Sequence, residues 1–187
     1  MALVKAVFLD RDGVINVDTG YVCKWENFKF ISGYLEALKA LQENGYLLFI
    51  VTNQSGIARG KYTKEDYELL TNTMLNHLSI NGIKIAEVYY CPHLEGSLIK
   101  QYNIRCDCRK PKPGMLLRAA TEWGVNLGES ILIGDKASDI EAAKLAGIGK
   151  AYKIKCNNDN STTHFGTSYK NLIECVKSIM PEASYSS

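Results

Sequence analysis

Ala6-Val7-Phe8-Leu9-Asp10-Arg11-Asp12-Gly13 sets the architecture that we expect for this chain. An apolar run typical of a buried strand ends in two carboxylates one residue apart, and a glycine then lets the chain turn away. Ligands bind at the carboxyl ends of strands in an open α/β sheet, so Asp10 and Asp12 are placed for chemistry. Taken alone, the pair is also compatible with ordinary turn chemistry after a strand. Motifs elsewhere in the sequence are needed to distinguish a ligand site from an ordinary turn.

Length and composition predict one domain. The chain has 187 residues, a net charge of +2, 22% charged residues and 46% hydrophobic residues. This length suits a single core, so we expect one domain over residues 1–180 and a disordered tail over 181–187. The balanced charge gives no indication of nucleic-acid binding, and no apolar run approaches the roughly 20 residues of a membrane span. Without a signal peptide we expect a cytoplasmic protein, and nothing demands more than a monomer.

Strand-like runs alternate with helical stripes, which predicts an α/β fold with a doubly wound, mostly parallel, Rossmann-like sheet. Expected strands cover residues 4–9, 47–52, 85–90, 130–134 and 150–154. Expected helices end before Gly45, Gly124 and Gly147, and two more cover residues 67–78 and 172–179. We expect the first strand to be central. Residues 157–168 are polar and predict a loop.

The segment 91–113 fits neither period and is long for a connection inside a compact domain. Two Cys/His pairs stand at its ends, with 12 residues between them: Cys91, His93, Cys106 and Cys108. Three thiolates and one imidazole make a complete tetrahedral zinc set, so this loop is expected to bind structural Zn²⁺. A disulfide and accidental clustering are the alternatives, and a reducing compartment disfavours the disulfide. Cys23, Cys156, Cys175, His77 and His164 are assigned no role.

Polar residues follow three of the predicted strands. Arg109 and Lys110 come directly after the zinc ligands, so a zinc-held loop would fix two cations where a phosphate could meet them. The run Thr52-Asn53-Gln54-Ser55 can cradle phosphate oxygens or simply form a capped turn. If the fourth strand lies beside the first, Asp135 joins Asp10 and Asp12 in an oxygen-rich pocket suited to Mg²⁺.

Together these residues resemble the haloacid dehalogenase superfamily of phosphotransferases, in which Asp-x-Asp-Gly, Thr, Lys and Gly-Asp-x-x-x-Asp motifs occur in this order. They are Asp10, Asp12, Gly13, Thr52, Lys110, Gly134, Asp135 and Asp139. Within the superfamily, residues 51–60 and the zinc pairs resemble a branch without a cap domain that acts on a sugar bisphosphate. The histidinol-phosphatase branch shares the zinc loop and the Asp-Arg-Asp-Gly start and is the nearest alternative. A catalytically inactive, zinc-stabilised binding module is the second.

The resemblance implies a role for each candidate residue. Asp10 would be the nucleophile and Asp12 the proton carrier, while Thr52 and Lys110 would stabilise the transferring phosphoryl group. Mg²⁺ would be held by Asp10, the backbone carbonyl of Asp12 and Asp135. The phosphorylated sugar would contact Asp18, Thr19, Gly20, Tyr21, Asn53, Gln54, Ser55, Arg109 and Lys136, with Arg109 on the distal phosphate. Asp139 is expected to contact the catalytic groups without touching the substrate, or else to be an ordinary acidic residue at the start of a helix.

Overall fold

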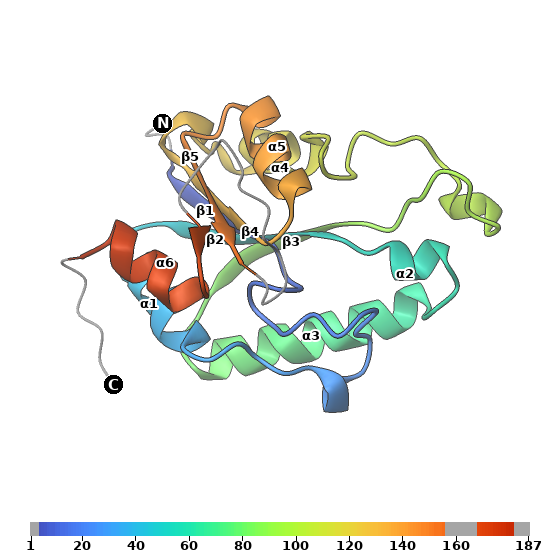
Figure 1. Cartoon of the computed structure of the whole chain (residues 1–187), viewed down its shortest axis with the longest axis horizontal. Helices are drawn as coiled ribbons and strands as arrows, with labels where there is room; N and C mark the ends of the chain where they lie inside the picture. The colour runs from blue at the N-terminus through green and yellow to red at the C-terminus, as the bar shows by residue number, and fades with distance from the viewer. Residues whose placement is uncertain (1–3, 156–167, 182–187) are drawn as a thin grey trace.

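The structure is a computed structural model that describes residues 4–155 and 168–181. All strands of its sheet are parallel, and their order is β3-β2-β1-β4-β5-β6. The strands are β1 Ala6–Leu9, β2 Leu47–Asn53, β3 Ile85–Cys91, β4 Ile131–Gly134, β5 Lys150–Ile154 and β6 Ser168–Tyr169. β1 lies inside the sheet between β2 and β4, as predicted (Figure 1). The chain order reverses between β1 and β4, which is where doubly wound sheets bind ligands.

The five predicted strands are confirmed at nearly their expected bounds. β6 was not predicted, because two residues are too few to show an alternation. It pairs with Lys153 and Ile154 of β5. Cys156, His164, the polar loop up to residue 167 and the tail from residue 182 lie outside the described residues.

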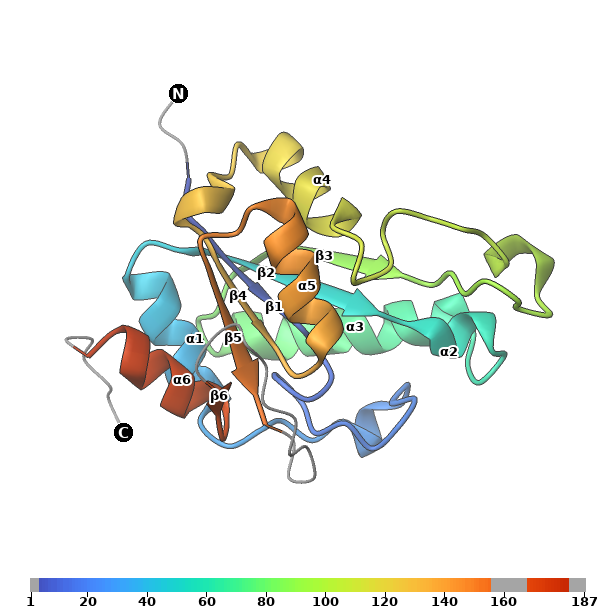
Figure 2. The same cartoon turned by 45° about the horizontal axis from the view of Figure 1, so that its top comes forward.

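Helices cover both faces of the sheet (Figures 1 and 2). They are α1 Tyr34–Glu43, α2 Ser55–Ala58, α3 Lys64–Ile80, α4 Gly114–Trp123, α5 Ala137–Ala146 and α6 Leu172–Ile179, with 3₁₀ turns at Trp25–Asn27, Lys100–Tyr102 and Leu127–Glu129. The views show α1, α3 and α6 on one face and α4 and α5 on the other. The doubly wound architecture is therefore confirmed.

The sequence of β1 explains these two layers. Val7 and Leu9 pack into the core formed with α1, α3 and α6, whereas Ala6 and Phe8 pack into the core formed with α4 and α5. All four side chains are fully buried. A strand covered on both faces reads as a continuous apolar run, which is why this segment shows no polar alternation.

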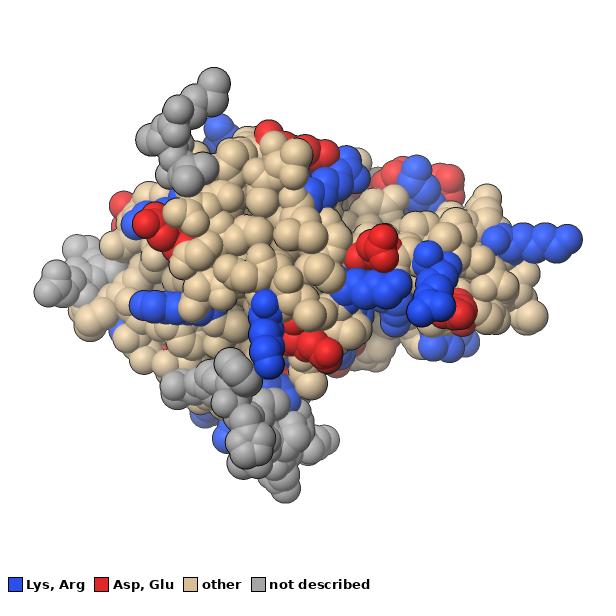
Figure 3. Space-filling model, turned by 90° about the horizontal axis from the view of Figure 1, so that it is seen from above, with Lys and Arg blue, Asp and Glu red and all other residues tan. Residues whose placement is uncertain are grey.

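Two irregular segments follow strands at the same end of the sheet. Residues 10–33 follow β1 and residues 92–113 follow β3, and in both the only described helix is a 3₁₀ turn, so neither holds a cap domain. The loop 92–113 projects beside α2, past the ends of β2 and β3 (Figure 2). On the face drawn in Figure 3, acidic and basic side chains of the described residues are interspersed around this end. Within the described ranges, no helix combines the length and the apolar character that crossing a bilayer requires.

Candidate active site

The carboxyl ends of β1 and β4 bring three carboxylates together. Oxygens of Asp10, Asp135 and Asp139 all lie within 4.8 Å of one another, and all three residues are buried. Asp10 and Asp135 follow adjacent strands, and the backbone N–H of Asp10 donates to Ile133 of β4 at 3.0 Å. Asp139 also accepts from the backbone N–H of Lys136 at 2.9 Å at the start of α5. The predicted convergence of Asp10 and Asp135 is thus seen in the structure.

A buried lysine from the loop 92–113 enters this cluster. The ammonium of Lys110 lies 3.2 Å from Asp10 Oδ1 and 2.5 Å from Asp139 Oδ1, and it donates to the carbonyl of Val51 at 2.7 Å. The amide of Asn53 holds the backbone of Lys110 with two hydrogen bonds of 3.0 Å each. Lys110 is therefore fixed between the two carboxylates by the end of β2.

The electrostatics of the cluster follow from burial and proximity. Burial raises the pKa of Asp10 to about 7; Lys110 opposes this, and Asp139 and Asp135 add to it. Burial alone would lower the pKa of Lys110, but the neighbouring Asp10 and Asp139 outweigh it and raise that pKa. The ammonium of Lys136 also lies 3.7 Å from Asp135, so two lysines face three carboxylates, which leaves one negative charge in excess when all three are ionised. Such a site favours a divalent cation.

The backbone around Gly13 shows that the residues fit Mg²⁺. Gly13 has a φ of +89°, and a Cβ placed there would come within 2.5 Å of Asp135 Oδ2. The Asp135 carboxylate therefore lies against the backbone that follows Asp12. Side-chain oxygens of Asp10 and Asp135 and the carbonyl of Asp12 are the hard ligands that Mg²⁺ prefers.

The side chain of Asp12 is held separately from this cluster. Its carboxylate accepts hydrogen bonds from Arg11 at 3.0 and 3.3 Å, from Asn16 at 3.0 Å and from Gln54 at 3.0 Å. Arg11 is 1% exposed, which is unusual for a charged residue and requires a partner. Asp10 and Asp12 thus stand in different surroundings, one among carboxylates and the other among N–H donors.

The four predicted zinc ligands form a second cluster. Cys91 Sγ lies 3.5 Å from Cys106 Sγ and 3.8 Å from His93 Nδ1, and His93 Nδ1 lies 3.4 Å from Cys108 Sγ. Tetrahedral Zn²⁺ with bonds of about 2.3 Å to sulfur and about 2.0–2.1 Å to nitrogen would separate its ligands by roughly 3.6–3.8 Å. The observed spacing fits such an ion, and it is far longer than the roughly 2.05 Å of a disulfide. The hydrogen bond between Cys91 and Cys108 lowers the pKa of Cys108 to about 5 and, together with burial, raises the pKa of Cys91.

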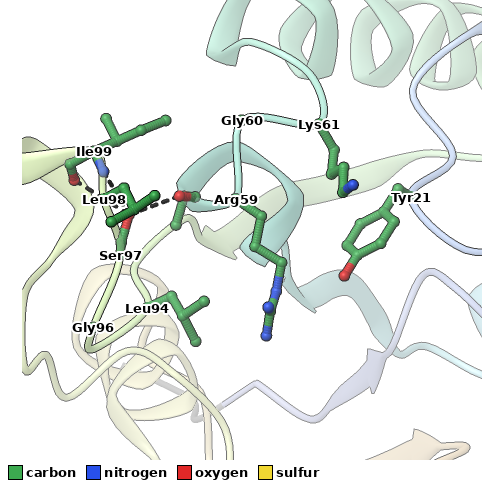
Figure 4. Close-up of a pocket in the computed structure, with 10 residues that line it drawn as sticks. Tyr21, Arg59, Gly60, Lys61, Leu94, Gly96, Ser97, Leu98 and Ile99 are labelled. Carbon is green, nitrogen blue, oxygen red and sulfur yellow. Dashed lines mark hydrogen bonds between the residues drawn. The ribbon is translucent and has the colours of Figure 1, made fainter.

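A pocket of about 700 Å³ lies between the loop 92–113 and the turn after α2 (Figure 4). Its lining residues are Tyr21, Ala58, Arg59, Gly60, Lys61, Leu94, Gly96, Ser97, Leu98 and Ile99. Ser97 joins the two walls because its hydroxyl donates to the carbonyl of Ala58 at 2.6 Å. Arg59 and Lys61 were not predicted, and they give this pocket a positive wall. Tyr21 comes from the segment after β1 and adopts a φ of +52°.

A family model described as haloacid dehalogenase-like hydrolase matches residues 10–147. The chain belongs to this family of hydrolases. It is 54% identical over 150 residues to D-glycero-beta-D-manno-heptose-1,7-bisphosphate 7-phosphatase of Vibrio cholerae serotype O1, covering 80% of this chain and 81% of the relative. It is 46% identical over 172 residues to the D-glycero-alpha-D-manno counterpart of Campylobacter jejuni, covering 92% and 94%.

A solved structure agrees with these relatives. D,D-heptose 1,7-bisphosphate phosphatase of B. bronchiseptica, crystallised with magnesium and phosphate, superposes with a TM-score of 0.82 at 27% identity and covers 96% of this chain and 100% of that one. The resemblance to the superfamily and to its heptose-bisphosphate branch is confirmed. This hydrolase is a phosphoric monoester hydrolase.

The other predicted residues of this hydrolase lie at the same end of the sheet. Asp18 lies 3.3 Å from Lys136 and accepts from the backbone N–H of Gly20 at 2.9 Å. Arg109 is half-buried, with its guanidinium 3.4 Å from the carbonyl of His93. Thr19 is exposed and Ser55 opens α2. Their substrate contacts remain predictions.

Three residues around Asp12 were also missed by sequence reasoning. Arg11 and Asn16 hold Asp12, and Tyr62 donates its hydroxyl proton to Gln54 at 2.5 Å. The side chain of Gln54, which was predicted to contact substrate, is buried against Tyr62 and Asp12, and its substrate contact stays a prediction. Arg11 lies between Asp10 and Asp12, and nothing in the sequence indicates that its side chain is buried.

Proposed function

We propose that this hydrolase removes the C7 phosphate of D-glycero-D-manno-heptose 1,7-bisphosphate and releases heptose 1-phosphate. The observation that carries the proposal is that Asp10 and Asp135 meet at the ends of adjacent strands, where Lys110 enters from the loop that also carries part of the Cys/His cluster. The relative of 54% identity supports the choice of substrate. The product would serve nucleotide-activated heptose biosynthesis, which feeds lipopolysaccharide and related glycans and would place the enzyme in the cytoplasm.

The reaction has two steps, formation of an aspartyl-phosphate and its hydrolysis. A carboxylate oxygen of Asp10 attacks phosphorus while the bond to the sugar oxygen breaks, and Asp12 gives that oxygen its proton. Water then attacks phosphorus of the aspartyl-phosphate, Asp12 takes a proton from the water, and phosphate leaves with Asp10 restored. The first step needs Asp10 to be ionised, which the neighbouring Lys110 favours.

The remaining polar groups stabilise the charge on the transferring phosphoryl group. Thr52 stands at the end of β2, and Lys110 places its ammonium 3.2 Å from Asp10. Asp10, Asp135 and the carbonyl of Asp12 would hold Mg²⁺, which when bound neutralises phosphate charge. Positioning and charge stabilisation carry most of the catalysis in phosphoryl transfer.

The proposed zinc ligands would have a structural role in the loop 92–113. Cys91 ends β3, while Cys106 and Cys108 lie just before Arg109 and Lys110, so closing this cluster fixes both cations relative to the sheet. A bound Zn²⁺ would supply four strong bonds to a loop that has few buried apolar side chains. We infer that Zn²⁺ orders the loop without entering the chemistry.

The substrate's remote part would lie among the surface groups around the cluster. Lys136 and Asp18 form one edge, and the pocket with Tyr21 and the positive wall of Arg59 forms another. Arg109 is proposed as the contact for the distal phosphate, because a guanidinium binds phosphate oxygens in pairs.

A side-by-side assay of phosphate release tests the proposal. The enzyme with Mg²⁺ is given the heptose 1,7-bisphosphate in both anomeric forms and histidinol phosphate at equal concentrations. We expect kcat/KM to be highest for a heptose bisphosphate. Preference for histidinol phosphate would assign the enzyme to that branch, and no turnover of any phosphate ester would indicate an inactive binding module.

A further inference from the structure

A hydrogen-bonded chain of side chains lies behind Asp12. The amide nitrogen of Gln54 donates to Asp12 Oδ2 at 3.0 Å and to the hydroxyl of Thr52 at 2.9 Å. The amide oxygen of Gln54 accepts from the hydroxyl of Tyr62 at 2.5 Å. The Tyr62 hydroxyl donates to the amide oxygen of Gln54, so the amide nitrogen faces Asp12 and Thr52, and flipping the amide would break these hydrogen bonds.

Arg11 forms a second arm of the same network. One of its terminal nitrogens lies 3.0 Å from both carboxylate oxygens of Asp12 and also donates to the carbonyl of Val22 at 3.2 Å. The guanidinium lies 6.0 Å from the ring centroid of Phe28 and 5.7 Å from that of Tyr67. Aromatic faces attract such a cation, and the Arg11 side chain is therefore confined on several sides.

The backbone leaves room for this arrangement at Gly56. A Cβ at Gly56 would come within 2.2 Å of the Tyr62 ring, so only glycine lets Tyr62 lie against α2. Tyr62 is 7% exposed and Gln54 is 2% exposed. The chain from Tyr62 through Gln54 to Asp12 is thus buried and sterically fixed.

We propose that Tyr62, acting through Gln54, and Arg11 are positioning residues that aim the Asp12 carboxyl at the leaving-group oxygen. The inference rests on the role of Asp12 in the proposed function. A general acid must lie within hydrogen-bond reach of the atom it protonates, so a rotated Asp12 loses its effect even when its chemistry is intact. Neither Tyr62 nor Arg11 needs to contact the substrate.

The variant Tyr62→Phe tests this proposal by comparing kcat/KM for two substrates whose leaving groups differ in their need for a proton. A sugar alcohol needs a proton when it leaves, whereas p-nitrophenolate is stable without one. We expect kcat/KM for the heptose bisphosphate to fall about 10-fold, a part of the roughly 10²–10⁴-fold that general acid catalysis supplies. For p-nitrophenyl phosphate we expect kcat/KM to change by less than about 3-fold, since general acid catalysis contributes little to its release.

Tyr89→Phe is the matched control. Tyr89 is 5% exposed, and its hydroxyl donates to Glu122 at 2.6 Å on the opposite side of the sheet from α3. Both substrates should react at the normal rate.

Gln54→Glu is the second test variant. It keeps the size of the side chain but replaces the amide nitrogen that donates to Asp12 with a carboxylate oxygen that can only accept when ionised. We expect the same selective loss of kcat/KM on the heptose bisphosphate.

Two results would overturn the inference: equal losses of kcat/KM on both substrates in Tyr62→Phe and Gln54→Glu, or no loss on the heptose bisphosphate in either. Failure of the proposed function is a separate result. It would appear as absent turnover of the heptose bisphosphate by the unmodified enzyme, before any variant is compared.

Discussion

Replacing Lys110 with methionine should both destabilise and inactivate the enzyme. Methionine keeps most of the apolar part of the side chain and removes the ammonium that lies 3.2 Å from Asp10 and 2.5 Å from Asp139. The carbonyl of Val51 loses its 2.7 Å partner as well. Removing one partner of a buried ion pair costs about 3–5 kcal/mol, because the other charge stays buried without compensation. We expect the free energy of unfolding to fall by about this amount.

The activity of this variant should fall further than its stability explains. Lys110 is proposed to stabilise the phosphoryl group, and losing one such preorganised donor lowers kcat by about 10²–10³-fold. Folded enzyme is therefore assayed at a temperature well below the unfolding transition. Adding Asp139→Asn to Lys110→Met removes one of the two uncompensated carboxylates, so part of the stability should return, with a coupling of about 0.5–3 kcal/mol.

Lys64→Met is the control for Lys110→Met. Lys64 pairs with Glu68 at 3.2 Å on the surface of α3, with both side chains 48% exposed. An exposed pair of this kind contributes about 0.3–0.5 kcal/mol. Urea unfolding of both variants gives the comparison. If Lys110→Met shifts the midpoint no more than Lys64→Met does, the buried network around Lys110 does not stabilise the fold.

Three further predictions concern other parts of the site. Gly13→Ala should lower the free energy of unfolding by more than about 1 kcal/mol, since alanine is strained at a φ of +89° and its Cβ would meet Asp135; an unchanged urea midpoint would count against this packing. Cys108→Ser should lower the zinc content measured by mass spectrometry and raise KM through Arg109, and full zinc occupancy with normal KM would refute the ligand assignment. Arg109→Gln should raise KM for the bisphosphate about 10-fold more than KM for a sugar monophosphate, roughly the effect of one charge-assisted hydrogen bond, whereas equal changes would exclude a contact with the distal phosphate.

Much of the site could be predicted from the sequence because of the sheet. Parallel strands end at one edge, so residues that directly follow β1, β2 and β4 have to meet there. Asp10, Thr52 and Asp135 were predicted on that basis. The clustering of Cys91, His93, Cys106 and Cys108 was predicted because two Cys/His pairs with tight spacing carry chemical information without any knowledge of the fold.

The residues that escaped prediction depend on how irregular segments fold back. Tyr62 reaches Gln54 only through the turn that α2 makes, and no periodicity marks that turn. Arg59 faces a pocket whose other wall is the loop 92–113, far away in sequence. Arg11 is buried because two aromatic rings from distant segments surround it. Such contacts are set by tertiary packing, which local patterns do not encode.

Trapping the covalent intermediate tests the central claim most directly. The enzyme is quenched in acid during turnover of the heptose bisphosphate, reduced with borohydride and digested, and the peptides are read by mass spectrometry. Borohydride converts an aspartyl-phosphate into homoserine, so we expect homoserine at position 10 and none in Asp10→Asn, which should also lack turnover while it remains folded. Homoserine at another aspartate, or substantial turnover by Asp10→Asn, would contradict the account.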